Sequence, residues 1–358
     1  MVNVLFYTGA SQWGGAEIVL GNLLAELGDG VRPALLGVDT DVLARVAARR
    51  PGTTWTQVPR IANKRDLRAI RAQRHAIAAA RPDIVQVNLP VPFAEPYTVL
   101  AALTVPRIKV IAVEHLPMAI RSRGIRLLNR VTAPRLAAHV AVGTSTAREI
   151  EALCRLPAGS VRVVPNGVPV PAAGTGSIRP GDAGFVIGAL GRLHRQKGFD
   201  VLLRALARLP DAHLVLVGDG PERGALERLA GELAVADRLT ITGWDDAAAG
   251  YLPSFDAVAL PSRFEGLPLV LLEAMLHGRA VVATPAGSIP DAVQDGVTGL
   301  LVPVDDDRAL ASALARLRDE PALRSRLGSA AAEVARQRFT APEMARGYEQ
   351  LYTELVAR

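Results

Sequence analysis

The sequence has a single cysteine, Cys154, among its 358 residues, and aromatic side chains make up only 4% of it. One cysteine cannot form an intrachain disulfide, so a disulfide-stabilised secreted domain is excluded and a cytoplasmic location is the simplest expectation. Because so few aromatic rings are available to interleave with the basic residues, we expect no nucleic-acid partner.

Long apolar runs are also missing. The longest stretches without a charged residue, 1–16 and 163–178, are 16 residues long and contain glycines. A membrane-spanning helix needs about 20 predominantly apolar residues, so none is expected. The first stretch has no basic residues ahead of its apolar part, so a signal peptide is not expected either.

Several ligand motifs are absent. The chain has no GxGxxG dinucleotide fingerprint, no GxxxxGK[ST] loop and no Cys/His group with zinc spacing. The run Asp305, Asp306 and Asp307 precedes a helical pattern and is predicted to cap that helix rather than to bind metal. We therefore expect neither a metal ion nor a cofactor.

Positive charge is concentrated in the first half of the chain. Residues 1–170 contain 21 Lys and Arg against 11 Asp and Glu, whereas the remainder contains 20 against 24. A field of this sign attracts phosphates on a nucleotide, a nucleic acid or a membrane surface.

Length and hydrophobic patterning predict two α/β domains. A chain of 358 residues with 49% hydrophobic side chains exceeds what one core usually holds. Short runs rich in Val, Ile and Leu alternate with helical patterns, as in doubly wound, Rossmann-like sheets of buried parallel strands. The predicted strands are 2–8, 34–38, 83–88, 109–114 and 139–142, then 185–190, 213–217, 239–242, 257–260, 280–283 and 300–302. The clearest helical patterns are 198–209, 221–234, 267–277 and 308–318.

A change in composition marks the domain boundary. Residues 169–182 hold three prolines and three glycines and show almost no helix or strand pattern. We predict an N-terminal domain over 1–169, a linker over 170–182 and a C-terminal domain over 183–340. Ligands of open α/β sheets bind beyond the carboxyl ends of the strands, so the predicted site is a cleft where two such sheets face each other.

Two strand ends carry candidate anion-binding residues. Gly14 and Gly15 lie between the first strand and a helix, where backbone N–H groups can approach a phosphate or a sugar. Gly191 and Arg192 end a strand of the second domain, and Lys197 follows at the next helix. Arginine binds phosphate bidentately and lysine adds a point charge, so together they could neutralise a departing diphosphate without a metal. The alternatives are a tight turn without a ligand and a solvated, basic helix start.

The segment 261–273, PSRFEGLPLVLLE, carries two carboxylates. Glu265 and Glu273 are about two helical turns apart, which suits a sugar and a ribose at two points of one extended ligand. Glu273 lies in an apolar run, where an ionised group is costly without partners. Backbone N–H groups of Gly266 and Leu267 are predicted to face phosphate at the helix start. The alternative is a salt-bridged structural glutamate.

Weaker candidates end other strands. Gly218 precedes a helix-opening proline, which is by itself a common turn. Gly243 and Trp244 could offer backbone atoms and a ring to a nucleobase, although a buried core tryptophan fits equally well. His115 follows the strand 109–114 and could hydrogen-bond a sugar or a phosphate, although a lone histidine is more often structural.

In order and spacing, these motifs resemble the retaining glycosyltransferases of the GT-B fold, family 4 type. The resemblance covers nearly the whole chain and is strongest in the second half. It rests on the motifs GGAE (14–17), PNGV (165–168), GRL (191–193), KG (197–198), GDGP (218–221), EGLP (265–268), EAM (273–275) and DGVTGL (295–300).

The resemblance implies a nucleotide diphosphate sugar as donor, held mainly by the second domain, with Arg192 and Lys197 at the diphosphate. The other implied contacts are Glu273 to the ribose hydroxyls, Glu265 to the transferred hexose-type sugar, Gly266, Leu267 and neighbours of Pro268 to the phosphates, Gly14 and Gly15 from the first domain, and His115 near the reacting sugar. It also implies that a terminal helix, 341–358, returns to the first domain, and that transfer retains the anomeric configuration.

Two other function classes stay open. A nucleotide-sugar epimerase can share this two-domain architecture and would interconvert sugars without an acceptor. A non-catalytic nucleotide-sugar-binding protein would show no turnover.

The acceptor could be a glycan, a lipid-linked sugar or a small molecule. Two basic amphipathic segments favour a peripheral position on the inner face of an anionic membrane, with a lipid-linked acceptor. Solvated faces of an arginine-rich protein are the alternative. The segments contain Arg60, Lys64, Arg65, Arg68, Arg71, Arg74 and His75, and Arg121, Arg123, Arg126 and Arg130 among Ile120, Ile125, Leu127 and Leu128.

Overall fold

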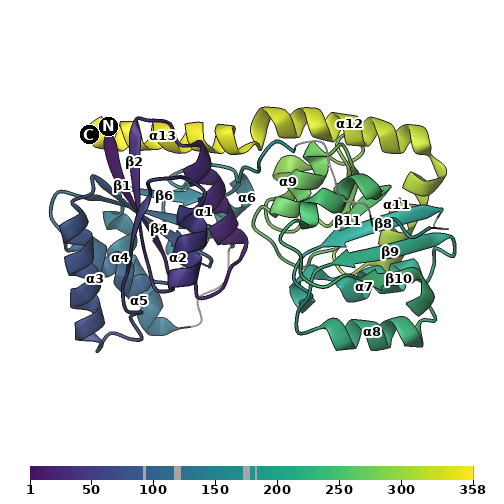
Figure 1. Cartoon of the computed structure of the whole chain (residues 1–358), viewed down its shortest axis with the longest axis horizontal. Helices are drawn as coiled ribbons and strands as arrows, with labels where there is room; N and C mark the ends of the chain where they lie inside the picture. Colours follow the sequence, from purple (N-terminus) through teal and green to yellow (C-terminus); the bar gives the residue numbers. More distant parts are fainter. Residues whose placement is uncertain (92–93, 117–121, 172–177, 182–183, 358) are drawn as a thin grey trace. The chain divides into compact units, whose positions relative to one another are not determined.

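The computed structural model describes residues 1–91, 94–116, 122–171, 178–181 and 184–357. They form two compact units, Met1–Pro169 with Thr340–Arg358, and Val170–Phe339 (Figure 1). Each unit contains one sheet in which every paired strand is parallel. The prediction of two doubly wound α/β domains is therefore confirmed.

The sheet of the first unit has seven strands in the order β3-β2-β1-β4-β5-β6-β7. The strands are β1 (Val2–Thr8), β2 (Val31–Gly37), β3 (Thr54–Gln57), β4 (Ile84–Leu89), β5 (Lys109–Glu114), β6 (Ala138–Ala141) and β7 (Arg162–Val163). The α-helices are α1 (Gly15–Glu26), α2 (Thr40–Ala47), α3 (Leu67–Ala80), α4 (Pro96–Leu103), α5 (Arg123–Thr132), α6 (Thr144–Cys154) and α13 (Ala341–Ala357).

Helix α13 is last in the sequence but packs into the core of the first unit. Tyr348 and Tyr352 are buried, and the Tyr352 ring meets Phe6 of β1 edge-on, with 6.4 Å between ring centroids. The Tyr352 hydroxyl donates a hydrogen bond of 2.5 Å to Oε1 of the buried Gln86 in β4. Two large aromatic side chains with one satisfied hydroxyl anchor this helix to the central strands.

The sheet of the second unit has six strands in the order β10-β9-β8-β11-β12-β13. The strands are β8 (Phe185–Leu190), β9 (Ala212–Val217), β10 (Leu239–Ile241), β11 (Ala257–Leu260), β12 (Ala280–Ala283) and β13 (Leu300–Leu301). The α-helices are α7 (Phe199–Leu206), α8 (Arg223–Glu232), α9 (Leu269–Leu276), α10 (Ile289–Ala292), α11 (Asp307–Asp319) and α12 (Pro321–Arg338). Figure 1 shows α7 and α8 on one face of this sheet and α9 and α12 on the other.

Differences from the predicted elements have local physical reasons. The edge strand β3 was not predicted because its four side chains, Thr54–Gln57, are all exposed and form no apolar run. Helix α9 begins at Leu269 rather than Leu267, because Pro268, in an extended conformation, is the N-cap. The carboxylate of Asp306 accepts the N–H groups of Arg308 and Ala309, so the predicted capping role of the Asp run is confirmed.

Within the described ranges, no helix combines the length and the hydrophobicity that crossing a bilayer requires.

Candidate functional site

The strand order of the second unit reverses between β8 and β11. From β8 the sheet continues through β9 to β10, and from β11 it continues through β12 to β13. Segment 191–198 follows β8 and segment 261–268 follows β11. Ligands of doubly wound sheets bind outside the carboxyl ends of the strands at such a switch point. Both predicted anion-binding segments therefore flank the position that the topology favours.

Lys197 and Glu265 form an ion pair at this point. The Lys197 ammonium lies 2.6 Å from Oε1 of Glu265, and the Ser262 hydroxyl donates to the same oxygen at 2.8 Å. Glu265 is 6% exposed, and these two partners compensate the cost of burying its carboxylate. An ammonium has three protons, so Lys197 can pair with Glu265 and still donate to a second anion.

Two glycines allow close contacts between the loops that carry this pair. Gly198 has a φ of +67°, and a Cβ there would lie 2.0 Å from the carbonyl oxygen of Pro261. Gly287 has a φ of +54°, and a Cβ there would lie 1.9 Å from the carbonyl oxygen of Glu265. Glycine alone adopts left-handed backbone conformations without strain and permits such approach.

We expect Gly287→Ala to lower the free energy of unfolding by about 2 kcal/mol or more, because the methyl group adds a steric clash to backbone strain. Urea denaturation measures the loss. Gly296→Ala is the matched control, since Gly296 has a φ of +71° but nothing within 4 Å of its Cβ position among the described residues. Its expected loss is about 1 kcal/mol. Equal losses would show that the contact with Glu265 has no energetic role.

Arg263 ties the same loops together. Its guanidinium forms a two-pronged contact with the Asp200 carboxylate at 2.9 and 2.7 Å and donates to Asp305 at 2.7 Å and to the carbonyl oxygen of Arg195 at 2.6 Å. Neither Arg263 nor Ser262 was predicted to contribute to the site. Their sole signal was their position inside the segment 261–273, because Asp200 is 63 residues away in sequence.

Three further predicted glycines line adjacent strand ends. Gly191 and Gly218 have φ angles of +138° and +148°, and a Cβ at Gly218 would lie 2.1 Å from the carbonyl oxygen of Gly191. Gly243 forms a bridge to Gly218. The next residue, Trp244, is 55% exposed and its indole N–H donates to Asp246 at 3.2 Å. The alternative of a buried core tryptophan is therefore wrong.

Arg192 and Glu273 do not join the ion pair. Arg192 is exposed, and Glu273 is half-buried in α9; neither side chain has a hydrogen bond or ion pair with another described residue. Burial raises the pKa of Glu273 to about 7. The alternative of a salt-bridged glutamate thus applies to Glu265 and not to Glu273, whose ionisation costs free energy in the unliganded unit.

Gly266, Leu267 and Pro268 are buried just ahead of α9. The Gly266 carbonyl oxygen accepts the Ser288 N–H at 2.8 Å. The predicted helix start at Leu267 is wrong, because the first helical residue is Leu269. That the N–H groups of Gly266 and Leu267 face a phosphate stays a prediction. The N–H groups of the first turn, which can face an anion, belong to Leu269 and the residues after it.

The remaining candidates belong to the first unit. Gly14 is the N-cap of α1, and a Cβ at Gly15 would meet no described residue within 4 Å. His115 follows β5, and its buried Nε2 has no hydrogen-bond partner among the described residues. Burial lowers the pKa of His115 to about 4, so this ring is neutral at pH 7. Their contacts with a ligand stay predictions.

In the part of the chain that the structure describes, no three His, Cys, Asp or Glu side chains gather as metal ligands would.

Two protein families match consecutive parts of the chain. Residues 13–170 match the model described as "Glycosyltransferase Family 4", and residues 184–320 match "Glycosyl transferases group 1". The second match contains the Lys197–Glu265 pair, Arg192 and Glu273.

Curated relatives match over part of their length. The chain is 39% identical over 179 residues to the lipopolysaccharide core biosynthesis glycosyltransferase LpsD of Rhizobium meliloti, covering 50% of this chain and 52% of the relative. It is 36% identical over 159 residues to the alpha-D-kanosaminyltransferase of Streptomyces kanamyceticus, covering 42% and 41%. The matched stretch thus spans about half of LpsD.

Solved structures match over the whole chain. Anabaena Alr3699/HepE in complex with UDP and glucose superposes with a TM-score of 0.81 at 20% identity, covering 99% of this chain and 100% of that one. A glycosyltransferase from Rickettsia africae gives a TM-score of 0.84 at 17% identity, with 99% and 98% covered. At these identities the likeness is one of fold, and it confirms the predicted GT-B fold.

Proposed function

The chain belongs to the GT-B glycosyltransferases, and from this premise we propose that it transfers a hexose-type sugar from a nucleotide diphosphate sugar to an acceptor hydroxyl. We propose retention of the anomeric configuration and no requirement for a metal ion. The observation that carries the proposal is the Lys197–Glu265 ion pair of 2.6 Å at the switch point of the second sheet. The UDP and glucose bound by Anabaena HepE support a donor of this class.

The cations of this site are suited to the leaving group. Cleavage of the bond between the anomeric carbon and the phosphate oxygen builds negative charge on the diphosphate. Lys197 is already held by Glu265. Arg192 and the N-terminus of α9 also follow the carboxyl ends of strands. Preorganised groups of this kind stabilise developing charge without having to reorient during the reaction. We therefore assign Lys197 and Arg192 as the catalytic cations.

The two carboxylates are suited to hydroxyl groups. Oε1 of Glu265 accepts the hydrogen bonds from both Lys197 and Ser262, which leaves Oε2 for the transferred sugar. Glu273 has no partner among the described side chains, and we assign it to the ribose hydroxyls. A vicinal diol that donates two hydrogen bonds would compensate the cost of an ionised, half-buried carboxylate.

The proposed step needs no protein nucleophile. The acceptor oxygen attacks the anomeric carbon on the face from which the diphosphate departs, so one C–O bond breaks and another forms with retention. The acceptor's proton passes to a phosphate oxygen of the leaving group, which balances the charge. His115, neutral at pH 7, is assigned to the transferred sugar as a hydrogen-bonding residue.

We expect acceptor-dependent release of a nucleoside diphosphate when the full chain is incubated with UDP-, GDP- and dTDP-sugars and a cell extract, and we expect the rate to be unchanged by EDTA. Interconversion of the sugar without an acceptor would instead identify an epimerase. Donor binding without turnover would identify a binding protein. Loss of activity in EDTA that Mg²⁺ restores would contradict the role of Arg192 and Lys197 as the neutralising cations.

We also propose that the first unit rests on an anionic membrane and takes a lipid-linked acceptor. Helix α3 buries Ala69, Gln73 and Ile77 and exposes Arg68 and Arg71 on its other side. Helix α5 exposes two apolar side chains, Leu127 (62%) and Val131 (47%), next to the exposed residues Arg126 and Arg130. Cationic side chains beside exposed apolar ones are typical of helices that lie in a membrane interface. Two residues of this prediction, Ile120 and Arg121, lie outside the described residues.

The double variant Arg68→Glu/Arg71→Glu is expected to weaken binding to phosphatidylglycerol vesicles at least about tenfold at low salt, because each basic residue near such a surface contributes about 1 kcal/mol. Vesicle cosedimentation at rising salt measures it. Arg228→Glu, a reversal at an exposed position of α8, is the matched control. Equal binding of all three proteins would leave a soluble acceptor as the better explanation.

A further inference from the structure

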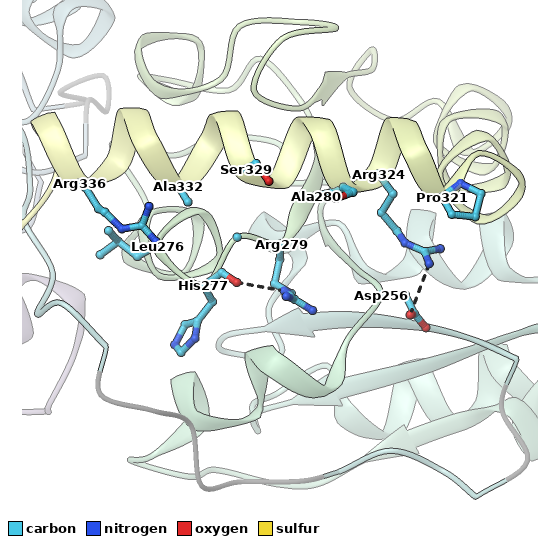
Figure 2. A pocket seen from close by; sticks show the side chains of 12 residues that line it. Asp256, Leu276, His277, Arg279, Ala280, Pro321, Arg324, Ser329, Ala332 and Arg336 are labelled. Carbon is cyan, nitrogen blue, oxygen red and sulfur yellow. Dashed lines mark hydrogen bonds and ion pairs between the residues drawn. The ribbon is translucent and has the colours of Figure 1, made fainter.

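A second cavity lies at the amino ends of strands in the second unit. Asp256 immediately precedes β11, and Arg279 immediately precedes β12. Together with the C-terminal end of α9 and one face of α12, they line a cavity of about 530 Å³ (Figure 2). The proposed donor residues follow the carboxyl ends of the strands, whereas this cavity lies at the amino ends of the strands.

The charge of this cavity is opposite to that of its unit. Residues 170–339 contain 18 Lys and Arg against 21 Asp and Glu. The cavity is lined by three arginines, Arg279, Arg324 and Arg336, and Asp256 is the one acidic residue among its twelve lining residues. Like charges repel, so three arginines around one cavity favour the binding of an anion there.

Asp256 is mostly engaged by other groups. Its Oδ2 accepts the backbone N–H of Val186 at 2.8 Å and lies 3.0 Å from the Arg179 guanidinium. Arg324 approaches the other oxygen only to 4.0 Å, beyond hydrogen-bond distance. One carboxylate shared among these groups cannot neutralise all the arginines of the cavity.

Arg279 is held in place with donor capacity left over. Its Nε donates to the carbonyl oxygen of His277 at 3.2 Å and its Nη1 to that of Phe255 at 3.1 Å. Burial lowers the pKa of Arg279. The positive charge of Arg324 lowers this pKa further, whereas the negative charge of Asp256 raises it. A guanidinium fixed by carbonyl groups offers its remaining N–H groups in a preorganised geometry.

Helix α12 adds donors along one face. Ser325, Ser329 and Arg336 line the cavity and recur at intervals of four and seven residues, which places them on one side of the helix. Arg336 is exposed, and its guanidinium makes no hydrogen bond or ion pair with the described residues. Figure 2 shows Arg336 and Arg324 extending from α12 toward the side of the cavity that carries Arg279 and His277.

We propose that this cavity binds a phosphate-bearing anion. Arg279, Arg324 and Arg336 contact the phosphate oxygens, and the two serine hydroxyls contact the rest of the bound molecule. Arginine is the side chain best matched to phosphate geometry, and a cavity of this size accommodates more than one phosphate group. The phosphate could belong to a soluble compound or to a lipid headgroup, since both present the same oxygens. The site is separate from the donor residues and does not depend on the proposed transferase activity.

The first arm of the test uses inorganic pyrophosphate and calorimetric titration of the full chain. The donor site is removed with Arg192→Ala/Lys197→Ala, so that binding reports on the second cavity. In this background, Arg336→Glu is expected to weaken binding at least about tenfold, the effect of losing a charge-assisted bond. Arg326→Glu is the matched control, because Arg326 is exposed on the same helix but does not line the cavity. Arg324→Gln tests the site through a second arginine, without charge reversal.

The second arm distinguishes the two sources of phosphate. The wild-type chain, Arg336→Glu, Arg324→Gln and Arg326→Glu are cosedimented with phosphatidylglycerol vesicles and with phosphatidylcholine vesicles. A loss specific to Arg336→Glu on phosphatidylglycerol supports a lipid headgroup, and a loss confined to pyrophosphate supports a soluble ligand. Affinities of Arg336→Glu and Arg324→Gln that equal those of Arg326→Glu for both probes would overturn the proposal.

Discussion

Alanine in place of Lys197 is expected to lower turnover at least about 100-fold, the effect of removing one preorganised charge-stabilising group. The substitution removes the ammonium 2.6 Å from Glu265 and leaves that buried carboxylate with Ser262 as its remaining hydrogen-bond donor among the described residues. Both losses act on the transfer step, because the ammonium is assigned to the leaving diphosphate and Glu265 to the transferred sugar. The measurement is kcat for donor consumption at saturating acceptor, together with Tm to confirm folding.

Two controls separate the contribution of Lys197 from general effects on its loop. Arg195→Ala removes a neighbouring exposed cation but keeps the backbone carbonyl that Arg263 uses, so activity is expected within about twofold of the wild type. The double variant Lys197→Ala/Glu265→Gln removes the ammonium and its partner charge together. Recovery of wild-type turnover in the double variant would show that Lys197 only neutralises Glu265 and does not act on the diphosphate.

Glu273→Gln is expected to reduce turnover by a similar factor, at least about 100-fold, and to stabilise the protein at alkaline pH. Burial raises the pKa of Glu273 from 4.5 to about 7 in the folded state. Between these values the folded state binds more protons than the unfolded state, so the free energy of unfolding falls as pH rises through this window. At pH 8 the full cost is present, on the order of 2 kcal/mol after allowance for solvent at a half-buried carboxylate.

The stability of Glu273→Gln, compared with wild type by urea denaturation at pH 4.5 and pH 8, checks this sign. A gain at pH 8 that disappears at pH 4.5 is expected, because glutamine keeps the shape and removes the charge. Glu265→Gln is the matched comparison and is expected to lose stability at pH 8, since its carboxylate is paired with Lys197. A loss of stability in both variants would mean that Glu273 has a structural partner and is not kept for a ligand.

Sequence patterns were sufficient for the central strands of both sheets and insufficient for the two edge strands of the first sheet. Buried strands such as β1 and β8 are continuous apolar runs, because both faces of a parallel sheet are covered. Edge strands such as β3 and β7 expose every side chain and carry no such signal. The start of α9 was misplaced by two residues, because an apolar pattern continues through Pro268 while the helix does not.

The candidate site shows the same division at the level of single residues. Lys197 and Glu265 were each singled out from local motifs, but their ion pair joins positions 68 residues apart. The contacts of Arg263 with Asp200 and Asp305 join three loops, and no spacing rule relates those positions. The cavity at Arg279, Arg324 and Arg336 had no sequence signal, because its arginines come from two elements separated by more than one strand and helix.

Local patterns alone were enough to predict two doubly wound domains, the family and the residues proposed for the donor site, because hydrophobic periodicity and motif order are properties of short segments. Tertiary structure decided which carboxylate is paired and which is not. It also decided where helix α9 begins, and where cationic side chains gather at the carboxyl and the amino ends of the strands of the second sheet. These features depend on strand order and loop contact, which bring distant residues together only after the sheet has formed.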